Sequence, residues 1–490
     1  MLKKVQGASW DSIFLIVVRL LTTLTTIVQT RVLSAGLTLQ EYGSYSQAIL
    51  VASIATSFIM FGLGDGLNYF YNRESGDNND RDAYINTIFF IEILVGMMGA
   101  LAICSSRNLI ARQFENPDVS ILLCIISIKP MLDNISYLYQ LLFISIQKAK
   151  VIAIRNLTIS IAKVAIIWYC VQFYSDVKLI CAAFVILDIA NWIIFKWLLS
   201  KEGLRININK ADLKLVKSIV SYSFPMGVYA LTSALLRDVD KLVVGKLAST
   251  SQLAVYANCS KILPFDLIAT SFATVLIPYI MKYVTSEDKI SIEKLLANYI
   301  RIGYYSVWTF AVSVLIMSEQ VIDFLYSSKY IVGKSIFILY LFDSMIRFAC
   351  FHLVLTAKGH SKDIMIYSFV SLIANLLLNI VLYPILGLMG PAVATVLVTL
   401  TYTFLIIRKT ILVAGIKFMH VVNLKEIACF IGELIVFGAV FSFLKIKLIT
   451  IGVDGTLSML LVIIGFCSTV FTINIRNLHG VLHEFNSLKM

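Results

Sequence analysis

The chain is poor in charged residues for its length. Asp, Glu, Lys and Arg make up 14% of its 490 residues, whereas hydrophobic residues make up 59%. A soluble domain carries about 25% charged residues. The scarcity of charge therefore excludes a soluble globular protein and predicts a polytopic membrane protein. The net charge is nevertheless +12. The placement of the cations indicates that this positive charge serves membrane topology and contact with anionic lipid, and not the binding of nucleic acid.

Sequence motifs for cofactor chemistry are also missing. The chain has no P-loop, no G-x-S-x-G and no Gly-rich nucleotide fingerprint, so nothing points to ATP or to an enzyme. His479 and His483 lack the acid of a zinc motif. No C-x-x-C pair occurs, so we expect neither a metal site nor a redox site, no cofactor, and buried structural thiols instead. The eight cysteines lie in apolar stretches at positions 104, 124, 170, 181, 259, 350, 429 and 467.

Long apolar runs fill the sequence from end to end. A helix needs about 20 apolar residues to cross a bilayer, and the connections between runs are short, so no soluble domain is predicted. The first run is long and lacks a small-residue cleavage site, so we expect it to remain as a helix. Fourteen spans are predicted, at 12–33, 43–67, 85–104, 119–146, 151–173, 179–199, 218–245, 252–281, 298–317, 330–355, 364–386, 390–412, 424–444 and 451–474.

The distribution of Lys and Arg agrees with fourteen spans and with both termini in the cytoplasm. On this topology 25 of the 41 cations fall on the inner side, 9 on the outer side and 7 within the spans. Inner loops carry an excess of Lys and Arg in membrane proteins. Arg155 is counted with the inner loops here.

A weak internal repeat suggests how the spans are organised. Residues 31–35 and 40–45 end the first span and open the second, and residues 245–249 and 252–256 do the same between spans seven and eight. Secondary transporters are commonly built from such repeats. We therefore expect an all-α protein of two pseudo-symmetric six-helix lobes with two extra helices: lobe 1–199, a basic cytoplasmic linker 200–217, lobe 218–415, and residues 416–490 carrying spans 13 and 14.

Three segments carry a family resemblance. They read TRVLSAGLTLQEYGSYSQA at 30–48, YSFPMGVYALTSALLRDVDKLVVGKLASTSQLAVYANCSKI at 222–262, and NLLLNIVLYPILGLMGPAVATVLV at 375–398. The second is the most specific, with a Pro in an aromatic entry, Asp240 in mid-helix and Gly245 before the next helix. The chain resembles the polysaccharide-biosynthesis flippases, relatives of the multidrug/toxin exporters and of the lipid II flippases, over roughly residues 10–415.

The resemblance implies a fold, a cargo and a location. It implies a V-shaped fourteen-helix bundle that works by alternating access and moves undecaprenyl-pyrophosphate-linked oligosaccharide units for O-antigen lipopolysaccharide or capsule. The expected location is the bacterial inner membrane. Expected partners are that lipid-linked oligosaccharide, the bilayer, and a polysaccharide polymerase with its chain-length machinery, with no nucleic acid. The identity of the sugar does not follow.

Seven cations lie inside or at the edge of the spans. A cation at mid-membrane costs on the order of 3 kcal/mol, so it usually faces a partner or a wet cavity. A membrane protein that keeps this many is expected to handle something negatively charged. The seven are Arg19, Lys129, Lys163, Arg237, Lys241, Lys261 and Arg347.

Some of these cations have an acid three or four residues away on the same helix. The pairs are Lys129 with Asp133, Asp343 with Arg347, Arg237 with Asp240, and Asp238 with Lys241. Opposite charges at this spacing lie on one helix face. Each pair either neutralises itself within the bundle or marks a substrate pathway, and the sequence leaves both open.

Other cations lack a local acid and require a partner from elsewhere. Arg19 and Lys163 have no acid within four positions, and Lys261 has only Asp266, which is turned away. Arg suits phosphate through its fork of donors, and Lys acts as a point charge. We predict Arg19, Lys163, Arg237 and Lys261 as the diphosphate-facing cations.

Several acids in the spans have no obvious local partner. Asp65, Asp188 and Asp240 are candidates for binding a coupling ion or for pairing with these cations, and Glu92 and Glu433 are similar. The sequence does not separate the two roles.

Two other functions remain in view. A multidrug/cation antiporter of the same fold would capture its cargo with acids, yet the first span carries Arg19 and no buried acid. A membrane polysaccharide polymerase or ligase would need a sizeable outer loop, and the outer loops here are short. A passive scaffolding role in a glycan-assembly complex is compatible with the flippase function.

Overall fold

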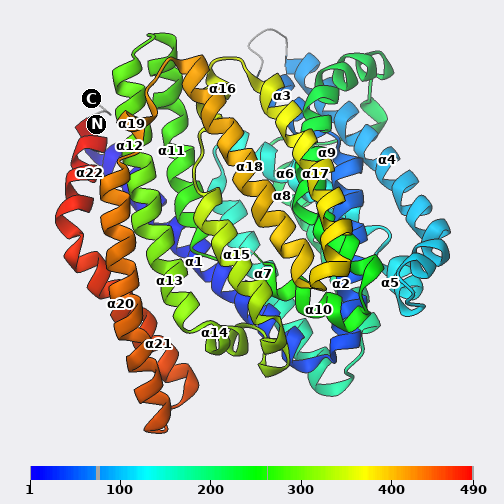
Figure 1. Cartoon of the computed structure of the whole chain (residues 1–490). Coiled ribbons are helices and arrows are strands. Elements are labelled where there is room, and N and C mark those ends of the chain that lie inside the picture. The colour runs from blue at the N-terminus through cyan, green and yellow to red at the C-terminus, as the bar shows by residue number, and fades with distance from the viewer. Residues whose placement is uncertain (1, 73–77, 262, 488–490) are drawn as a thin grey trace. The chain divides into compact units, whose positions relative to one another are not determined.

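The computed structural model describes residues 2–72, 78–261 and 263–487, and its regular secondary structure over these ranges is entirely helical (Figure 1). The prediction of an all-α chain is confirmed. Contacts divide the chain into two compact units, residues 1–255 and 256–490. The predicted lobes and linker come from a sequence repeat, and their boundaries stay a prediction.

The first unit contains the helices that carry most of the predicted site. Their bounds are α1 Leu2–Gly36, α2 Leu39–Met60, α3 Leu63–Asn72, α4 Asn78–Gln113, α5 Asp118–Ile126, α6 Lys129–Ser145, α7 Ala149–Phe173, α8 Val177–Lys201 and α9 Val216–Leu247, and α10 Thr250–Cys259 crosses into the second unit. Two short 3₁₀ turns, Ile208–Lys210 and Leu213–Leu215, lie in the predicted linker.

The second unit begins within α10 and contains the later helices. They are α11 Asp266–Thr285, α12 Lys289–Gly303, α13 Thr309–Ile316, α14 Ser318–Leu325, α15 Lys334–Arg347, α16 His352–Ala357, α17 Ser361–Leu386, α18 Met389–Ala414, α19 Phe418–Val421, α20 Leu424–Thr450, α21 Gly455–Ile473 and α22 Ile475–Ser487. A single π-helical turn, Tyr304–Trp308, joins α12 to α13.

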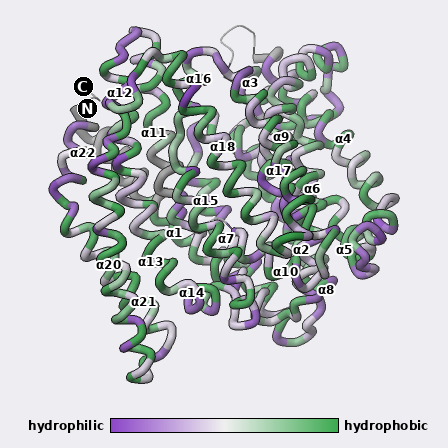
Figure 2. The backbone as a smooth tube through the Cα atoms, in the orientation of Figure 1, coloured by the Kyte–Doolittle hydropathy of each residue, from purple (hydrophilic) through white to green (hydrophobic). Residues whose placement is uncertain are grey.

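Eleven helical stretches of the described residues are long and apolar enough to cross a membrane. Figure 2 shows how hydrophobic residues dominate these helices. Each stretch overlaps one predicted span. They are Leu39–Asn72, Arg81–Gln113, Asp118–Ser145, Ala149–Phe173, Val177–Lys201, Leu213–Leu247, Lys289–Ile316, Ser361–Leu386, Met389–Ala414, Leu424–Thr450 and Gly455–Ile473.

Three predicted spans are not among the eleven. Span 12–33 lies in α1. Span 252–281 is divided between α10 and α11, and span 330–355 between α15 and α16. A polytopic membrane protein is therefore established, and the count of fourteen stays a prediction.

Two close backbone approaches shape the first unit. The bend between α2 and α3 places Gly62 at φ +78°, a conformation that favours glycine. A Cβ built on Gly62 would lie 2.3 Å from the Ser223 carbonyl oxygen of α9, and one on Gly227 would lie 2.7 Å from the backbone of Phe61. Larger residues at either position would push α9 away from the bend, so both must be glycine.

The two copies of the sequence repeat begin their helices in the same way. At α2, the Thr38 hydroxyl accepts from the Glu41 amide, and the Glu41 carboxylate accepts from the Thr38 amide. At α10, Ser249 and Gln252 make the equivalent reciprocal bonds, at 3.0 and 3.2 Å. This arrangement is a capping box, which satisfies two otherwise unpaired amides. The structure therefore aligns Glu41 with Gln252 and Tyr45 with Tyr256.

Candidate functional site: a charged cluster on three helices

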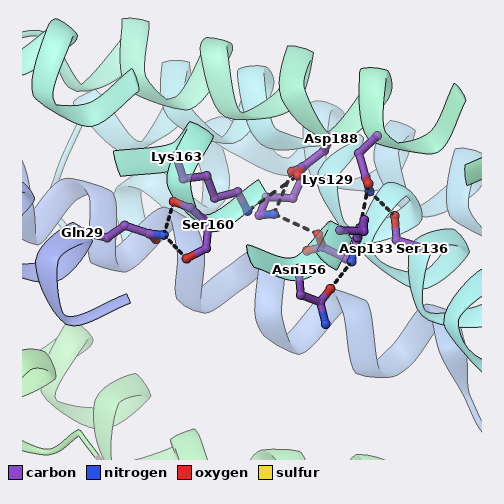
Figure 3. Close-up of polar contacts among 10 residues, drawn as sticks. Gln29, Lys129, Asp133, Ser136, Asn156, Ser160, Lys163 and Asp188 are labelled. Carbon is purple, nitrogen blue, oxygen red and sulfur yellow. Dashed lines mark hydrogen bonds and ion pairs between the residues drawn. The ribbon is translucent and has the colours of Figure 1, made fainter. Parts of the chain in front are cut away.

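A charged cluster lies within the first unit, among α1, α6, α7 and α8 (Figure 3). It forms where the fourth span breaks: α5 ends at Ile126, and α6 begins at Lys129 with Pro130 in its first turn. Proline is tolerated there because the first amides of a helix have no partner within it. The break places Lys129 at the start of a new helix, beside α8.

Lys129 is held by two carboxylates. Its Nζ lies 2.9 Å from Asp133 Oδ1 and 3.0 Å from Asp188 Oδ2. The Asp188 side chain on α8 is only 8% exposed, whereas that of Asp133 is 40% exposed. The local pair Lys129–Asp133 was predicted from its spacing and is confirmed, and Asp188 is an additional partner from another helix.

Lys163 shares Asp188 with Lys129. Its Nζ lies 3.7 Å from Asp188 Oδ1 and 5.5 Å from the centre of the Phe184 ring. This ion pair is longer than either made by Lys129. An aromatic face attracts a cation through its quadrupole, and the attraction strengthens when the cation is desolvated. Lys163 is therefore the less tightly held of the two lysines.

Arg155 completes the cluster and was missed from the sequence. It lies in α7, where its Nε donates to Asn191 Oδ1 at 2.7 Å and its Nη1 donates to Asn156 Oδ1 at 2.7 Å. Its guanidinium carbon lies 4.4 Å from the centre of the Phe195 ring. Asn191 in turn donates to Ser136 of α6 at 3.1 Å. The only signal in the sequence was its position at the edge of an apolar run, next to Asn156.

The cluster carries one more positive than negative charge. Three cations, Lys129, Lys163 and Arg155, face two carboxylates, Asp133 and Asp188. The direct partners of Arg155 named above are amide oxygens and an aromatic ring, which are neutral. A surplus cation that is partly withdrawn from water favours the binding of an anion.

A neutral polar contact ties the cluster to α1. Gln29 Nε2 donates to the Ser160 carbonyl at 2.9 Å and to its hydroxyl at 2.8 Å, and the hydroxyls of Thr25 and Ser160 lie 2.6 Å apart. Figure 3 shows Gln29 and Ser160 beside the charged residues. Hydrogen bonds of this kind hold helices together in a bilayer.

The structure brings together only some of the predicted site residues. Lys163 and Asp188 meet in the cluster. Arg19 of α1 and Asp65 of α3 are both exposed. On α9, Arg237 is exposed and lies 3.7 Å from Asp238, while Asp240 is buried and accepts from the Lys241 amide. These four are not members of the cluster.

The remaining predicted residue belongs to the second unit. Lys261 donates to Asn258 Oδ1 at 2.7 Å, and its Nζ lies 5.7 Å from the centre of the Tyr326 ring. It therefore has polar and aromatic partners within its own unit.

Two further local pairs match their predicted spacing and one does not. Lys241 Nζ lies 2.8 Å from Asp238, and Arg347 lies 3.5 Å from Asp343, as expected. Arg237, by contrast, pairs with its neighbour Asp238 and not with Asp240. Spacing along a helix says which residues share a face but does not say which carboxylate a long side chain will contact.

Comparison with known proteins assigns the family. A family model described as polysaccharide biosynthesis protein matches residues 32–334, more than half of the chain. A relative described as a probable low-salt glycan biosynthesis flippase, Agl15 of Haloferax volcanii, is 21% identical over 253 residues, covering 50% of this chain and 52% of the relative. A relative described as a probable lipid II flippase, MurJ of Rickettsia prowazekii, is 23% identical over 334 residues, covering 64% and 63%. The chain thus spans about half to two thirds of the length of these curated relatives.

Solved structures share the fold. The lipid II flippase MurJ in an inward closed conformation superposes with a TM-score of 0.73 at 16% identity, covering 95% of this chain and 99% of that one. An inward-facing multidrug resistance MATE family transporter of the MOP superfamily gives a TM-score of 0.65 at 13% identity, covering 80% and 94%. These likenesses show the fold of the chain. The chain belongs to the polysaccharide biosynthesis protein family and has a MurJ- and MATE-like fold.

Proposed function

We propose that this protein is a flippase that moves undecaprenyl-pyrophosphate-linked oligosaccharide units across the bacterial cytoplasmic membrane by alternating access. The observation that carries the proposal is the cluster of Lys129, Arg155 and Lys163 around two carboxylates, with one positive charge in excess. A pyrophosphate is the anionic part of such a cargo. Arg and Lys are the side chains that suit it, the first through paired donors and the second as a point charge.

The cluster suggests how the headgroup is held and released. Lys163 is the cation most readily turned toward an anion, because its one ion pair among the described residues is 3.7 Å long and Asp188 keeps Lys129 as a closer partner. When the cargo leaves, Asp188 is ready to take Lys163 back. Such exchange keeps binding modest, which a carrier needs because a ligand held too tightly is not released.

Other parts of the proposal rest on the family and its relatives. One relative is described as a probable low-salt glycan biosynthesis flippase and another as a probable lipid II flippase. We extend this to fourteen spans, two six-helix lobes, both termini in the cytoplasm, and a glycan of the O-antigen or capsule type, with a polymerase and chain-length machinery as partners. Arg19, Arg237 and Lys261 remain proposed as further headgroup cations, and Asp65 and Asp240 as ion-coupling or charge-partner residues.

The antiporter alternative has less support from the same residues. An organic cation would need a carboxylate free to receive it. In the cluster both Asp133 and Asp188 already hold Lys129, and the cations outnumber the acids. A polymerase or ligase would need a sizeable outer loop, and the fourteen-span topology expected from the sequence has only short outer loops.

Deletion of the protein in its native host tests the proposal. Lipid-linked oligosaccharide is extracted and surface polysaccharide is quantified. A flippase predicts that complete undecaprenyl-linked units accumulate on the inner side while surface glycan is lost. Single units on the outer face without polymerisation would identify a polymerase instead. Unchanged glycan with new sensitivity to cationic drugs would identify an antiporter.

A further inference from the structure

The structure brings together two cysteines that the sequence keeps apart. Cys104 of α4 and Cys124 of α5 have their Sγ atoms 3.5 Å from each other. They are twenty positions apart and form no C-x-x-C motif, so the sequence predicted no redox site. The pair lies outside the charged cluster, and nothing in the proposed transport mechanism uses it.

A cation sits against both sulfurs. Arg107, one turn after Cys104, has its Nη1 3.5 Å from Cys104 Sγ and 3.3 Å from Cys124 Sγ. Nearby cations stabilise the thiolate, which is the form of cysteine that attacks a disulfide. The same cation opposes the binding of a metal ion between the two sulfurs. The environment therefore favours thiol–disulfide chemistry over metal binding.

The surrounding contacts fix the register of the two helices, and one of the two cysteines lies at the protein surface. The Ser120 hydroxyl of α5 donates to Asn108 Oδ1 of α4 at 2.6 Å, about one turn from the cysteine pair. Cys124 is exposed and Cys104 is partly buried. Of the other six cysteines, Cys429 is also exposed, but it stands on α20 in the second unit. Access, proximity and a neighbouring cation thus coincide at Cys104 and Cys124.

We infer that Cys104 and Cys124 form a reversible dithiol–disulfide site that links α4 to α5 when it meets a disulfide oxidant. In the first step the Cys124 thiolate attacks the external disulfide, forms a mixed disulfide and releases one thiolate of the oxidant. In the second step Cys104 attacks the Cys124 sulfur and releases the other. The protein loses two protons and two electrons, and one external disulfide becomes two thiols, so the exchange balances.

The bond would act on the broken fourth span. α5 ends at Ile126, and α6 begins at Lys129 of the charged cluster. The oxidised pair fixes α5 to α4, whereas in the reduced pair only non-covalent contacts connect them. The linked state therefore restrains the helix that leads directly into α6.

The test uses the full-length protein purified in detergent, with oxidised glutathione as the oxidant. Thiols are counted by a maleimide mass tag before and after oxidation, and the linkage is read by mass spectrometry after trypsin digestion. Arg107 and Arg112 lie between the two cysteines, so trypsin separates them unless they are bonded. We expect loss of two tags and a linked pair of peptides lighter by two hydrogen atoms, both restored by reductant.

Three variants make the result specific. In Cys104→Ser, a mixed disulfide with glutathione should persist on Cys124, because the resolving thiol is gone. In Arg107→Gln, adduct formation should slow by about threefold, because the cation that contacts both sulfurs is gone. Cys429→Ser is the matched control: it removes one accessible thiol and should leave the loss of two tags unchanged.

Several results would overturn the inference. One such result is that both cysteines of the unmodified chain keep their tags after oxidation, and another is that both carry glutathione without a linked peptide. Either outcome would show that the two sulfurs do not close a bond. An unchanged rate in Arg107→Gln would remove the role given to that arginine.

Discussion

In the first unit Asp188 is shared by two lysines, whereas in the second unit Glu426 is shared by one arginine and two tyrosines. Asp188 lies 3.0 Å from Lys129 and 3.7 Å from Lys163. Arg301 donates two bonds to Glu426 Oε2, at 2.9 and 2.6 Å. The hydroxyls of Tyr304 and Tyr305 donate to Glu426 Oε1, at 2.7 and 3.1 Å.

The two carboxylates differ in the charge of their additional hydrogen-bonding partners. Hydroxyls fill the second oxygen of Glu426 without adding charge, so the Arg301–Glu426 pair stays neutral. Asp133 and Asp188 together balance the two lysines, so Arg155, whose named partners are neutral, adds a positive charge that neither carboxylate cancels. Satisfied, neutral networks serve to fasten helices, whereas a surplus charge leaves a site open to a ligand. We therefore interpret Glu426 as a structural fastening and Asp188 as part of a binding site.

The fastening in the second unit depends on local helix geometry. The two tyrosines lie in the π-helical turn Tyr304–Trp308, and Glu426 lies in the first turn of α20. A carboxylate at a helix N-terminus is favoured by the helix dipole. Asn477 of α22 donates to the Tyr305 hydroxyl at 3.3 Å, so three helical segments meet through this one carboxylate.

The largest expected effect comes from removing the shared carboxylate of the first unit. Asp188→Ala leaves Lys129 with one partner and removes the ion pair of Lys163, in a site where the lost side chain was almost buried. Breaking a buried ion pair typically costs about 3–5 kcal/mol. Thermal unfolding in detergent should show this loss. Adding Lys163→Met should recover part of it, and a single variant with wild-type stability would contradict the shared role of Asp188.

A smaller loss is expected in the second unit. Glu426→Ala strands Arg301 and two tyrosine hydroxyls, but Arg301 is 30% exposed and water can replace part of the lost partner. We expect about 2–3 kcal/mol, below the range for fully buried pairs. Transport per folded molecule should be unchanged. Glu433→Ala is the matched control on the same helix, because Glu433 accepts a single bond from Asn474.

Lys163→Met tests the surplus charge with little effect on folding. The variant removes the longest ion pair of the cluster and leaves Asp188 with Lys129. Loss of one phosphate contact worth about 1.4 kcal/mol would lower transport about tenfold. Surface glycan normalised to protein abundance measures it. Lys178→Met, an exposed position at the start of α8, is the control, and equal transport in both variants would remove Lys163 from the site.

The exposed ion pair of Lys334 and Glu319 in the second unit should contribute least to stability, so it serves as the reference for the effects expected at Asp188 and Glu426. Lys334 donates to Glu319 at 2.7 Å and holds the pKa of that carboxyl below its usual value. Because the folded pKa is lowered, the stabilisation is present above the unfolded value of about 4.3 and is lost as the pH falls through the folded pKa. Glu319→Gln should cost less than about 1 kcal/mol at pH 7. The gap between variant and wild type in thermal unfolding should close in acid.

Sequence reasoning succeeded where helix geometry alone decides the contact. Lys129–Asp133, Asp238–Lys241 and Asp343–Arg347 are three or four residues apart, and helical spacing places them together. The family motifs likewise led to the right family and fold.

Contacts between helices lay beyond that reasoning. Spacing showed that Lys163 needed a distant partner, but only the packing of α7 on α8 identified it as Asp188. Arg155 was counted with an inner loop because it lies near the start of the predicted span 151–173, and spacing does not show that its guanidinium reaches Asn191 of α8. Cys104 and Cys124 were predicted to be buried structural thiols. Their contact joins two different helices, α4 and α5, and no spacing along the sequence indicates such a contact.

The division of carboxylates among helices has a consequence for biogenesis. α6 carries both Lys129 and Asp133, so it can enter the bilayer already neutralised. α7 carries Lys150, Arg155 and Lys163 and has no acid of its own, and Asp188 reaches Lys163 only when α8 has been synthesised. Insertion of the fifth span therefore depends on the sixth. The two helices should be retained at the translocon as a pair, and a chain truncated before α8 should integrate α7 poorly.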